Sequence, residues 1–538
     1  MLSYVKGPDA QLLELTVDEA FQRTVKRLGN HLALVVSRQG QRLSWRELDL
    51  RVEATARGLA GLGLRPGDRV GVWSTNNLEW ILLQLATARL GLVLINVNPA
   101  YRSWELKYVL EKSGMKALFL LERDARANYR EILARALEGA VTSLEHTVFF
   151  DHDSWNRMLA EGRDYVLPVL SSSQVVNIQY TSGTTGSPKG VLLTHRNLVN
   201  NAWLIAQRLR LTEADRLCSP VPLYHCFGCV MSSLLCFVTG ATLILPAPQF
   251  DPLATLEAVH RERATALYGV PTMFIAELQQ ARFAEFDLTS LRTGIMAGAP
   301  CPIELMRRVI HDMHCSGMTI AYGQTESSPV ITLSHPEDPI ELRVGTVGCA
   351  MPATEVKIVS PQTGETLPVG QVGELCTRGY LVMKGYDGNT QATQEAIDPE
   401  GWLHTGDLAV MYENGYFGIR GRARDMIIRG GENIYPREIE DFFYTHPAVS
   451  DVAVFGVPDE RLGEVVCAWV RLKPGFQATA EQLREYCRER IAHYKTPAYI
   501  RIVDEFPLTV TGKIQKFRMR EAEIAARGLQ GAASVETA

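Results

Sequence analysis

VVNIQYTSGTTGSPKGVLLT, residues 175–194, places two apolar runs on either side of a loop that cannot pack a hydrophobic core. The runs 175–180 and 191–194 are typical of β-strands. The loop between them holds two pairs of hydroxyl residues, three glycines, a proline and a lysine. We therefore expect two strands joined by a loop that is built to hold a ligand or to lie in solvent.

The residue types in this loop suit a phosphate group. Glycines let backbone N–H groups approach an anion closely, and hydroxyl and ammonium groups donate hydrogen bonds to phosphate oxygens. A Walker A loop requires the spacing G-x-x-x-x-G-K-[ST] followed by a helix. Here Gly183, Gly186 and Lys189 are spaced differently and a strand follows. The pattern excludes a P-loop NTPase and leaves a phosphate site of another kind or a surface hairpin.

The composition is that of a globular protein with more than one domain. The chain has 538 residues, of which 46% are hydrophobic and 21% charged, and its net charge of −5 provides no basic surface for nucleic acid. The most apolar run, 229–245, is shorter than a membrane span and predicts a buried helix followed by a buried strand. The N-terminus lacks the apolar segment of a secretion signal. We expect a cytoplasmic protein without a transmembrane segment or a nucleic-acid partner.

Two of the ten cysteines, Cys226 and Cys229, have C-x-x-C spacing directly after His225. A redox or zinc site is one interpretation of this spacing. No second pair of ligands accompanies it, so the favoured interpretation is burial as small apolar side chains.

Alternating strand and helix patterns predict an α/β fold with mostly parallel strands. Ser44 and Glu47 form a capping box at the start of a helical pattern. Segments that begin at Gly91 and Gly240 each show a strand, a proline-bearing turn, an amphipathic helix and a second strand. They suggest two similar stacked α/β layers, although generic strand–helix–strand spacing would explain the likeness nearly as well.

The pattern of the sequence changes after residue 345. Short alternating segments divided by Gly and Pro predict a small β-rich subdomain, and a compact α+β pattern follows it. We expect a large N-terminal domain at 1–423, a small mobile α+β domain at 424–520 and a flexible tail at 521–538.

Four further motifs carry residues that suit a nucleotide. YGQTE at 322–326 joins an aromatic ring, a hydroxyl and a carboxylate, and HTGDLA holds Asp407, which could accept from a ribose. GRARD contains Arg422, and LTVTGKIQK contains Lys513 beside a glycine. Taken singly, these are also explained by a turn, a capping residue, a surface salt bridge and a solvated lysine.

In their joint order, these motifs resemble the adenylate-forming (ANL) superfamily, which includes acyl-CoA synthetases, peptide-synthetase adenylation domains and firefly luciferase. The resemblance runs from Leu43 to Arg518 and rests on YTSGTTGSPKG, AYGQTE, WLHTGDLA, GRARDMIIRGGENIYPREIE and PLTVTGKIQK. The stretches VNPAY, PLYHCFG, LYGVPTMF and THPAV look closest to medium-chain fatty acyl-CoA synthetases.

The resemblance implies a role for each motif residue in binding ATP. The β- and γ-phosphates would be bound by Thr181, Ser182, Gly183, Thr184, Thr185, Gly186 and Lys189. The adenine and its surroundings would be contacted by Gly298, Ala299, Pro300, Tyr322, Gly323 and Gln324. The remaining nucleotide contacts would be Thr325 on the α-phosphate, Asp407 and Arg422 on the ribose, and a magnesium ion held by Glu326 and Thr184.

The same resemblance implies a two-step reaction with ATP, Mg²⁺ and coenzyme A. A carboxylate attacks the α-phosphorus to give an acyl-adenylate and pyrophosphate, and the thiol of coenzyme A then displaces AMP. Lys513 would act only in the first step, and the small domain would rotate about Arg424, where many relatives carry Asp or Lys. Gly430 and Gly431 would line the path of the thiol. The implied catalytic residues are Lys513, Thr184, Glu326 and His225.

The substrate is expected to be a medium-chain carboxylic acid. Amino-acid-activating relatives place an acidic residue in the segment that matches 221–235, and this chain has none there. His225 matches a gate between the ATP site and the acyl pocket, with a buried core histidine as the alternative. The candidate pocket walls are Phe227, Met231, Tyr268, Val270 and Val330. An aryl-, terpenoid- or branched short-chain acid CoA ligase, a luciferase-like oxygenase, an inactive nucleotide-binding protein and a homodimer are left open.

Overall fold

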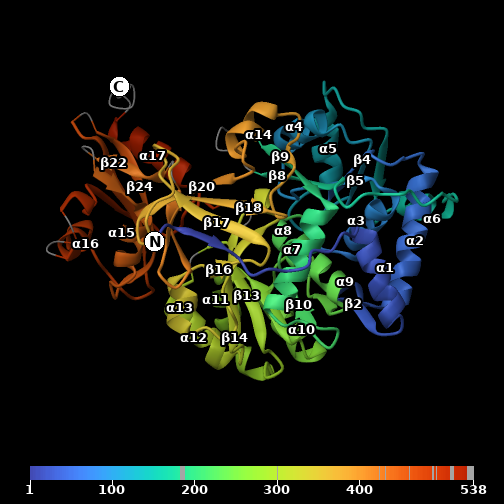
Figure 1. The fold of residues 1–538 in the computed structure, drawn as a ribbon, viewed down its shortest axis with the longest axis horizontal. Helices are drawn as coiled ribbons and strands as arrows, with labels where there is room; N and C mark the ends of the chain where they lie inside the picture. Colours follow the sequence, from blue (N-terminus) through green and yellow to red (C-terminus); the bar gives the residue numbers. More distant parts are fainter. Residues whose placement is uncertain are drawn as a thin grey trace. The chain divides into compact units, whose positions relative to one another are not determined.

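The computed structural model describes residues 1–181, 188–299, 301–422, 425–429, 432–459, 461–487, 490–491, 493–508 and 514–529. Within these ranges, no helix is long and apolar enough to cross a membrane. The chain divides into two compact units, whose elements are labelled in Figure 1. The large unit comprises Val5–Val356 and Cys376–His404. The small unit comprises Met1–Tyr4, Lys357–Leu375 and the chain from Thr405 onward.

The first sheet of the large unit contains the two strands that flank the glycine-rich loop. Its strand order is β19-β9-β8-β5-β4-β6-β7. Strands β4 to β8 are paired in parallel, whereas β9 is antiparallel to both of its neighbours. The bounds are β4 (Arg69–Trp73), β5 (Val93–Val97), β6 (Ala117–Leu120), β7 (His146–Phe149), β8 (Val175–Thr181), β9 (Lys189–Thr194) and β19 (Gly385–Tyr386). Both strands predicted around the loop are confirmed.

The second sheet has the order β16-β15-β14-β13-β12-β10-β11-β2-β3. Its central strands are parallel, and β3, β15 and β16 are antiparallel additions at the two edges. The bounds are β2 (Leu32–Val36), β3 (Gln41–Ser44), β10 (Arg216–Cys218), β11 (Thr242–Leu245), β12 (Ala266–Gly269), β13 (Thr293–Ala297), β14 (Gly317–Gly323), β15 (Val330–Leu333) and β16 (Cys349–Ala350). The predicted α/β class with mostly parallel strands is confirmed.

The likeness between the segments that begin at Gly91 and Gly240 is a repeat in the topology. β4 lies between β5 and β6 in the first sheet, as β10 lies between β11 and β12 in the second. Both glycines end the preceding helix with a positive φ, +67° and +95°, which favours glycine at this position. The two α/β layers suggested by the sequence are therefore present as two sheets.

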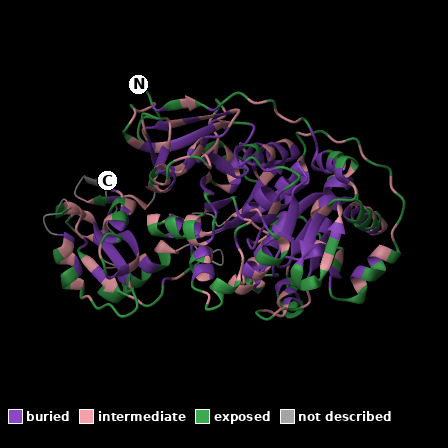
Figure 2. Cartoon of the chain, turned by 90° about the horizontal axis from the view of Figure 1, so that it is seen from below, coloured by how far each residue is buried: buried purple, intermediate pink, exposed green. Residues whose placement is uncertain are grey.

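Helices connect the strands and cover the sheets. Figure 2 shows that buried residues gather in the strands and that exposed residues gather on the helices. The α-helices of the large unit are α1 (Val17–Leu28), α2 (Trp45–Gly61), α3 (Leu78–Leu90), α4 (Ser103–Ser113), α5 (Tyr129–Leu137), α6 (Asp153–Ala160), α7 (His195–Arg208), α8 (Cys226–Gly228), α9 (Leu235–Thr239), α10 (Pro252–Glu262), α11 (Pro271–Leu278), α12 (Ile303–Asp312), α13 (Ile340–Gly345) and α14 (Thr390–Ala396). The predicted capping box of Ser44 and Glu47 begins α2.

The apolar run 229–245 forms a buried helical segment followed by a buried strand, as predicted. The π-helix η2 (Cys229–Leu234) continues into α9, and β11 follows. The short 3-10 helices of the large unit are η1 (Ser37–Gln39), η3 (Phe283–Glu285) and η4 (Thr325–Ser327).

A third sheet has the order β1-β17-β18-β20-β21, and all of its strands except β1 come from the chain after residue 345. Its strands are β1 (Tyr4–Lys6), β17 (Thr354–Val359), β18 (Val372–Gly379), β20 (Leu403–Met411) and β21 (Phe417–Arg422). This sheet is the predicted β-rich part of the chain.

The C-terminal part of the small unit is an α+β layer with a core on each face of its sheet. The sheet has the order β23-β22-β25-β24, with β26 on β25. Its elements are β22 (Ile427–Arg429), β23 (Glu432–Ile434), α15 (Pro436–Phe443), β24 (Val449–Asp459), β25 (Gly463–Leu472), α16 (Ala480–Cys487), η6 (His493–Lys495), β26 (Tyr499–Ile502) and α17 (Lys516–Arg527). Phe443 and Leu483 pack on one face and Met519 on the other. The smaller α+β domain is confirmed, and the limits 1–423, 424–520 and 521–538 remain a prediction.

A buried arginine joins the first three helices of the large unit. Arg89 of α3 is 5% exposed and donates to Asp18 of α1 at 2.9 Å and to Asp49 of α2 at 2.6 Å. A third bond of 3.2 Å runs to Glu53 of α2. Because the guanidinium presents donors in a fixed planar fork, it fixes the spacing of α1 and α2 across α3.

We expect Arg89→Met to lower the free energy of unfolding by about 3–5 kcal/mol, because the largely buried carboxyl group of Asp18 would lose its cation and its hydrogen-bond donor. Urea unfolding followed by circular dichroism measures the change. Arg307→Met is the control, since Arg307 forms an exposed i,i+3 pair with Glu304, and it should cost at most about 1 kcal/mol. Equal losses in the two variants would show that Arg89 does not hold these helices together.

Candidate active site

The β8–β9 hairpin fixes the two ends of the glycine-rich loop. Thr181, the last residue of β8, is paired with Lys189, the first residue of β9. The hydroxyl of Thr181 donates to the carbonyl oxygen of Lys189 at 3.5 Å. The structure thus brings these two predicted phosphate-binding residues together. The other predicted residues of the loop, Ser182, Gly183, Thr184, Thr185 and Gly186, lie outside the described residues.

Tyr386 connects Lys189 to the predicted magnesium ligand Glu326. Its short strand β19 pairs with β9, which brings the ring beside the hairpin. Lys189 Nζ lies 5.0 Å from the centre of the Tyr386 ring, a cation–π distance. The Tyr386 hydroxyl donates to Glu326 Oε1 at 2.9 Å, and the Glu326 carbonyl accepts from the N–H of Met383 at 2.9 Å. The segment 383–386 therefore holds Glu326 at two points.

Sequence analysis did not find Tyr386. The residue stands in the turn-rich segment KGYDGN, where its only local signal is a lone aromatic side chain among glycines. Burial raises the pKa of Tyr386, and the charge of Glu326 adds to this shift. The hydroxyl therefore remains a hydrogen-bond donor at neutral pH.

The carboxyl ends of β13 and β14 bring the predicted adenine-binding residues side by side. Ala297 is paired with Ala321, so Gly298 and Tyr322, which follow them, are neighbours at one edge of the sheet. Gly298 has a φ of +86°, and Ala299 beside it is exposed. Ligands of α/β proteins bind outside the carboxyl ends of parallel strands, so this edge suits a nucleotide base. Pro300 lies outside the described residues.

A tight turn after β14 positions Thr325 and Glu326. A Cβ atom on Gly323 would lie 1.8 Å from the carbonyl oxygen of Pro329, so only glycine fits there. The N–H of Gln324 donates to the same carbonyl at 3.0 Å and leads into η4, which begins with Thr325 and Glu326. The predicted nucleotide-binding residues 322–326 therefore form one compact feature.

The segment expected to line the acyl pocket contacts this turn. His225 is half-buried, and its Nδ1 accepts from the N–H of Phe227 at 3.2 Å, which caps α8. The neighbouring Cys226 Sγ lies 3.8 Å from Thr325 Oγ1. His225 is thus one residue away from a contact with the nucleotide-side turn.

Two of the candidate pocket walls pack against each other. The rings of Phe227 and Tyr268 are stacked, with centroids 5.8 Å apart and an interplanar angle of 29°. Met231 and Val330 are buried as well, whereas Val270 is half-buried. Phe227 and Met231 belong to the segment 221–235, which contains no acidic residue.

The C-x-x-C pair is buried, as the favoured interpretation predicted. Cys226 and Cys229 are 3% and 2% exposed, and neither forms a disulfide. Their surroundings are more polar than that interpretation implied, because Cys229 Sγ accepts from the amides of Asn96 and Gln179 at 3.4 and 3.3 Å.

The predicted ribose-binding residues are cross-strand partners in the small unit. Asp407 on β20 is paired with Arg422 on β21, and Arg422 Nε lies 3.1 Å from Asp407 Oδ1. Asp407 is 7% exposed, so the arginine compensates a buried charge. The other predicted residues of the C-terminal part, Arg424, Gly430, Gly431 and Lys513, lie outside the described residues.

The turn before Asp407 is held by hydrogen bonds within the small unit. The Thr405 hydroxyl donates to the Leu375 carbonyl at 2.7 Å and accepts from the Asp407 N–H at 3.1 Å. The Gly406 N–H donates to Glu374 Oε1 at 2.9 Å. Because the backbone of this turn is fixed on both sides, Asp407 has one defined position.

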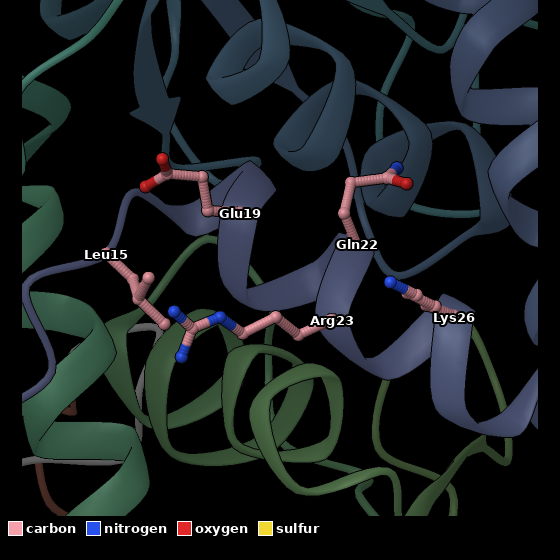
Figure 3. A pocket seen from close by; sticks show the side chains of 5 residues that line it. All are labelled: Leu15, Glu19, Gln22, Arg23 and Lys26. Atoms are coloured by element: carbon pink, nitrogen blue, oxygen red, sulfur yellow. The ribbon is translucent and has the colours of Figure 1, made fainter.

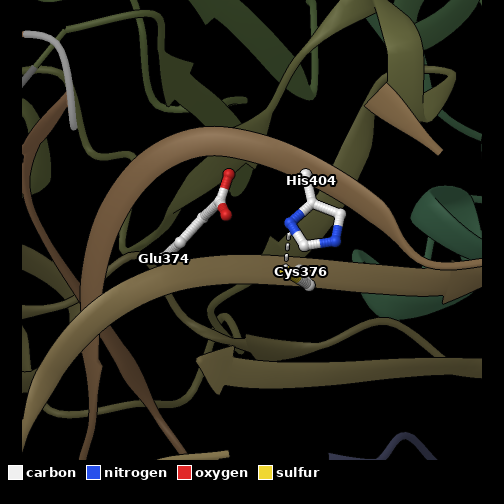
Figure 4. A group of neighbouring side chains, drawn as sticks. All are labelled: Glu374, Cys376 and His404. Atoms are coloured by element: carbon white, nitrogen blue, oxygen red, sulfur yellow. Dashed lines mark hydrogen bonds between the residues drawn. The ribbon is translucent and has the colours of Figure 1, made fainter. Parts of the chain in front are cut away.

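Two further features of the large unit carry polar side chains. Cys376 Sγ lies 3.4 Å from His404 Nδ1, as Figure 4 shows.

An open pocket of about 280 Å³ lies along α1 and is lined by Leu15, Glu19, Gln22, Arg23 and Lys26 (Figure 3). The pocket contains none of the predicted site residues, and Glu19 and Gln22 already bond to Thr16 and Asp49.

Comparison with known proteins agrees with this geometry. The sequence model of the family described as AMP-binding enzyme matches residues 21–387, and the model of the AMP-binding enzyme C-terminal domain matches residues 438–513. The chain is 45% identical over 540 residues to the Bacillus subtilis (strain 168) protein YngI, covering 96% of this chain and 98% of YngI. It is 44% identical to the medium-chain acyl-CoA ligase ACSF2, mitochondrial, of Mus musculus, covering 97% and 89% of the two chains.

The solved structures include similar folds. The ATP-bound MatB from Rhodopseudomonas palustris superimposes with a TM-score of 0.85 at 30% sequence identity, covering 94% of this chain and 99% of MatB. The similarity extends over both the large N-terminal and the smaller C-terminal parts.

We expect Tyr386→Phe to weaken the binding of ATP in magnesium-containing buffer by about tenfold, because a hydrogen bond to a charged carboxylate contributes about 1.5–3 kcal/mol. Isothermal titration calorimetry measures the dissociation constant. Tyr165→Phe removes another tyrosine–glutamate hydrogen bond, from Tyr165 to Glu53 at 2.7 Å, and should leave ATP binding unchanged. If the two variants bind ATP equally well, Tyr386 does not orient Glu326 for the nucleotide.

Proposed function

The chain belongs to the AMP-binding enzyme family, and we propose that it is an ATP-dependent fatty acyl-CoA synthetase that activates a medium-chain carboxylic acid through an acyl-adenylate. The observation that carries the proposal is the chain of contacts from Lys189 through Tyr386 to Glu326. Thr325, next to Glu326, contacts Cys226 of the segment 221–235, which would border the acyl group and contains no acidic residue.

The first step of the proposed reaction requires two anions to meet. A carboxylate oxygen of the acid attacks the α-phosphorus of ATP, the bond to pyrophosphate breaks, and an acyl-adenylate forms. Positive charge and N–H donors must neutralise the phosphate oxygens while this happens. Residues 181–186 and Lys189 would act on the β- and γ-phosphates, and Thr325 would act on the α-phosphate.

The residues present fit a magnesium ion. Glu326 and Thr184 would hold it, since carboxylate and hydroxyl oxygens suit this hard cation. The supporting observation is that Tyr386 and Met383 fix the half-exposed Glu326 from the protein side. When bound, magnesium would neutralise charge on the phosphate oxygens.

The second step transfers the acyl group to coenzyme A. The thiol attacks the acyl carbon, the carbon–oxygen bond to the phosphate breaks, and AMP leaves. In the proposal, the domain 424–520 rotates about Arg424, moves Lys513 away and brings Gly430 and Gly431 to the path of the thiol. Asp407 and Arg422 hold the ribose during both steps, which agrees with their fixed cross-strand pairing.

The substrate class is proposed from the acyl side of the site. An amino acid would need a carboxylate in the segment 221–235 to pair with its ammonium group, and none is present. Phe227 and Tyr268 offer stacked apolar surface instead. The relative in Mus musculus is named a medium-chain acyl-CoA ligase, which supports an aliphatic acid of medium length. The cytoplasmic location remains a prediction, and a homodimer remains open.

We expect medium-chain acids to give AMP, pyrophosphate and acyl-CoA, with kcat/KM higher than for benzoates, terpenoid acids, short branched acids or amino acids. One methylene changes selectivity by only about 1–3 kcal/mol, so acids of neighbouring length should also react. The measurement is a carboxylic-acid panel with ATP and coenzyme A. Release of pyrophosphate without any thioester would contradict the ligase function, and a preference for benzoates would favour an aryl-acid ligase.

We expect Lys513→Ala to slow adenylation by about 100-fold or more, because it removes a cation from a developing anion. Thioester formation from pre-formed acyl-adenylate should be retained, since Lys513 would then be turned away. Single-turnover kinetics of each half-reaction measures the two rates.

Asp407→Ala is the comparison variant, because a ribose contact serves both steps. It should slow both half-reactions. If Lys513→Ala slows thioester formation as severely as adenylation while the fold is intact, the rotation of the small domain is not part of this enzyme's cycle.

A further inference from the structure

Side-chain amides from the strands β5 and β8 and from the helix α3 gather around Cys229, at the start of the π-helix η2. Asn96 of β5 and Gln179 of β8 donate to Cys229 Sγ at 3.4 and 3.3 Å. Gln84 of α3 donates to the Cys229 carbonyl oxygen at 2.8 Å. Asn177 of β8 joins Gln179 to Asn96, with two bonds of 2.9 Å. We call Asn96, Asn177, Gln179 and Gln84 the amide cluster.

The cluster occupies a sheet face that an α/β protein would ordinarily fill with apolar side chains. On the opposite face of the same strands, Ile95 and Ile178 belong to a hydrophobic core with residues of α4 and α5. Asn96, Asn177 and Gln179 are 3%, 6% and 4% exposed. Burying an amide costs free energy unless the amide is hydrogen-bonded. Asn96 and Gln179 therefore depend on Cys229 of η2 as an acceptor.

The helical turn that Cys229 begins is unusual and is held by side chains. A π-helix is rare and is found mostly as a single turn near functional sites. The Ser232 hydroxyl donates to the Phe227 carbonyl at 3.0 Å, and the Ser233 hydroxyl donates to the Cys229 carbonyl at 2.8 Å. Gly228 lies so close to Pro222 that a Cβ atom would come within 2.2 Å of its carbonyl oxygen.

The same cluster reaches the residues before the turn. Asn96 also donates to the Tyr224 carbonyl at 3.2 Å, directly before His225. The segment from Tyr224 to Cys229 is thus fastened at both ends to β5, which is paired with β8. Gln179 lies two residues before Thr181, at the start of the phosphate loop. One polar network therefore connects the strand that carries the loop with the segment that carries His225 and Phe227.

We propose that Cys229 is a positioning residue for the acyl side of the site: by accepting from Asn96 and Gln179 it sets the register of η2 and so the position of Phe227 and Met231, two candidate walls of the acyl pocket. This inference rests on the proposed function, because it concerns the choice of acid by the same site. Burial raises the pKa of the Cys229 thiol, so the group remains protonated at neutral pH and its sulfur lone pairs are available to the amides. Cys229 itself is not assigned a contact with the reacting atoms.

The test compares Cys229→Ala, Cys229→Ser and Cys218→Ala. Alanine removes the acceptor of one N–H of Asn96 and one N–H of Gln179, whereas serine keeps an acceptor of smaller size. Cys218 is a matched control, because it is a free thiol in β10 with 0% exposure and packs in a hydrophobic cluster that contains no member of the amide cluster. All three variants are first compared by thermal unfolding, so that general destabilisation is measured separately.

In Cys229→Ala, kcat/KM for the best straight-chain acid should fall about tenfold, and the preference for that acid over acids two carbons shorter or longer should shrink by a similar factor. The KM for ATP should change less than twofold, because the substitution leaves the β8–β9 hairpin that carries the phosphate loop unchanged. Cys229→Ser should recover most of the preference. Cys218→Ala should keep the wild-type profile of chain lengths even if its unfolding temperature falls.

Hydrogen–deuterium exchange of the wild type and variants gives a second readout that does not depend on catalysis. Amides of 225–234 should exchange faster in Cys229→Ala and not in Cys218→Ala. Unchanged exchange there, or an equal change of chain-length profile in both alanine variants, would overturn the inference. A wild type that forms no acyl-CoA from any aliphatic acid would instead contradict the proposed function, and the exchange result would still decide whether Cys229 holds the turn.

Discussion

The pairing of β9 with two partners is the constraint on which the nucleotide side of the site depends. On one edge, β9 meets β8 and closes the hairpin that carries the glycine-rich loop. On the other edge it meets β19, a two-residue strand from a distant part of the sequence. A loop rich in glycine and hydroxyl residues has no core of its own, so its geometry comes from these anchors. The second pairing also supplies Tyr386.

Tyr386 shows how a neutral side chain can organise two charged ones. Its ring faces the ammonium of Lys189, and its hydroxyl donates to the carboxylate of Glu326. In a direct ion pair, the lysine and the glutamate would neutralise each other's charge. With the tyrosine in contact with each of them, the ammonium can act on a phosphate and the carboxylate on a metal ion. Since burial raises the pKa of the hydroxyl, it serves as a donor and not as a third charge.

Local patterns in the sequence predicted most of the fold, and distant strand pairing explains what they missed. The capping box of Ser44 and the two glycine-initiated repeats depend on neighbouring residues, and the structure contains both. The motif at 322–326 was recognisable because its residues act within one turn. Tyr386 and Asn96 carry no such local pattern, because the residues that they contact lie far away in the sequence. The phosphate loop was recognisable from its composition, although residues 182–187 are outside the described part.

The two repeated α/β layers also explain where the amide cluster lies. Each layer has its own strands and an apolar core of its own. The segment from Tyr224 to Cys229 follows β10 of the second layer, but Asn96 of β5 and Gln179 of β8 donate to it from the first layer. Hydrophobic packing alone is tolerant of small shifts between two surfaces, whereas buried amides lose their bonds when the surfaces slide. The amide cluster thus fixes the position of the segment that carries His225 relative to the sheet that carries the phosphate loop.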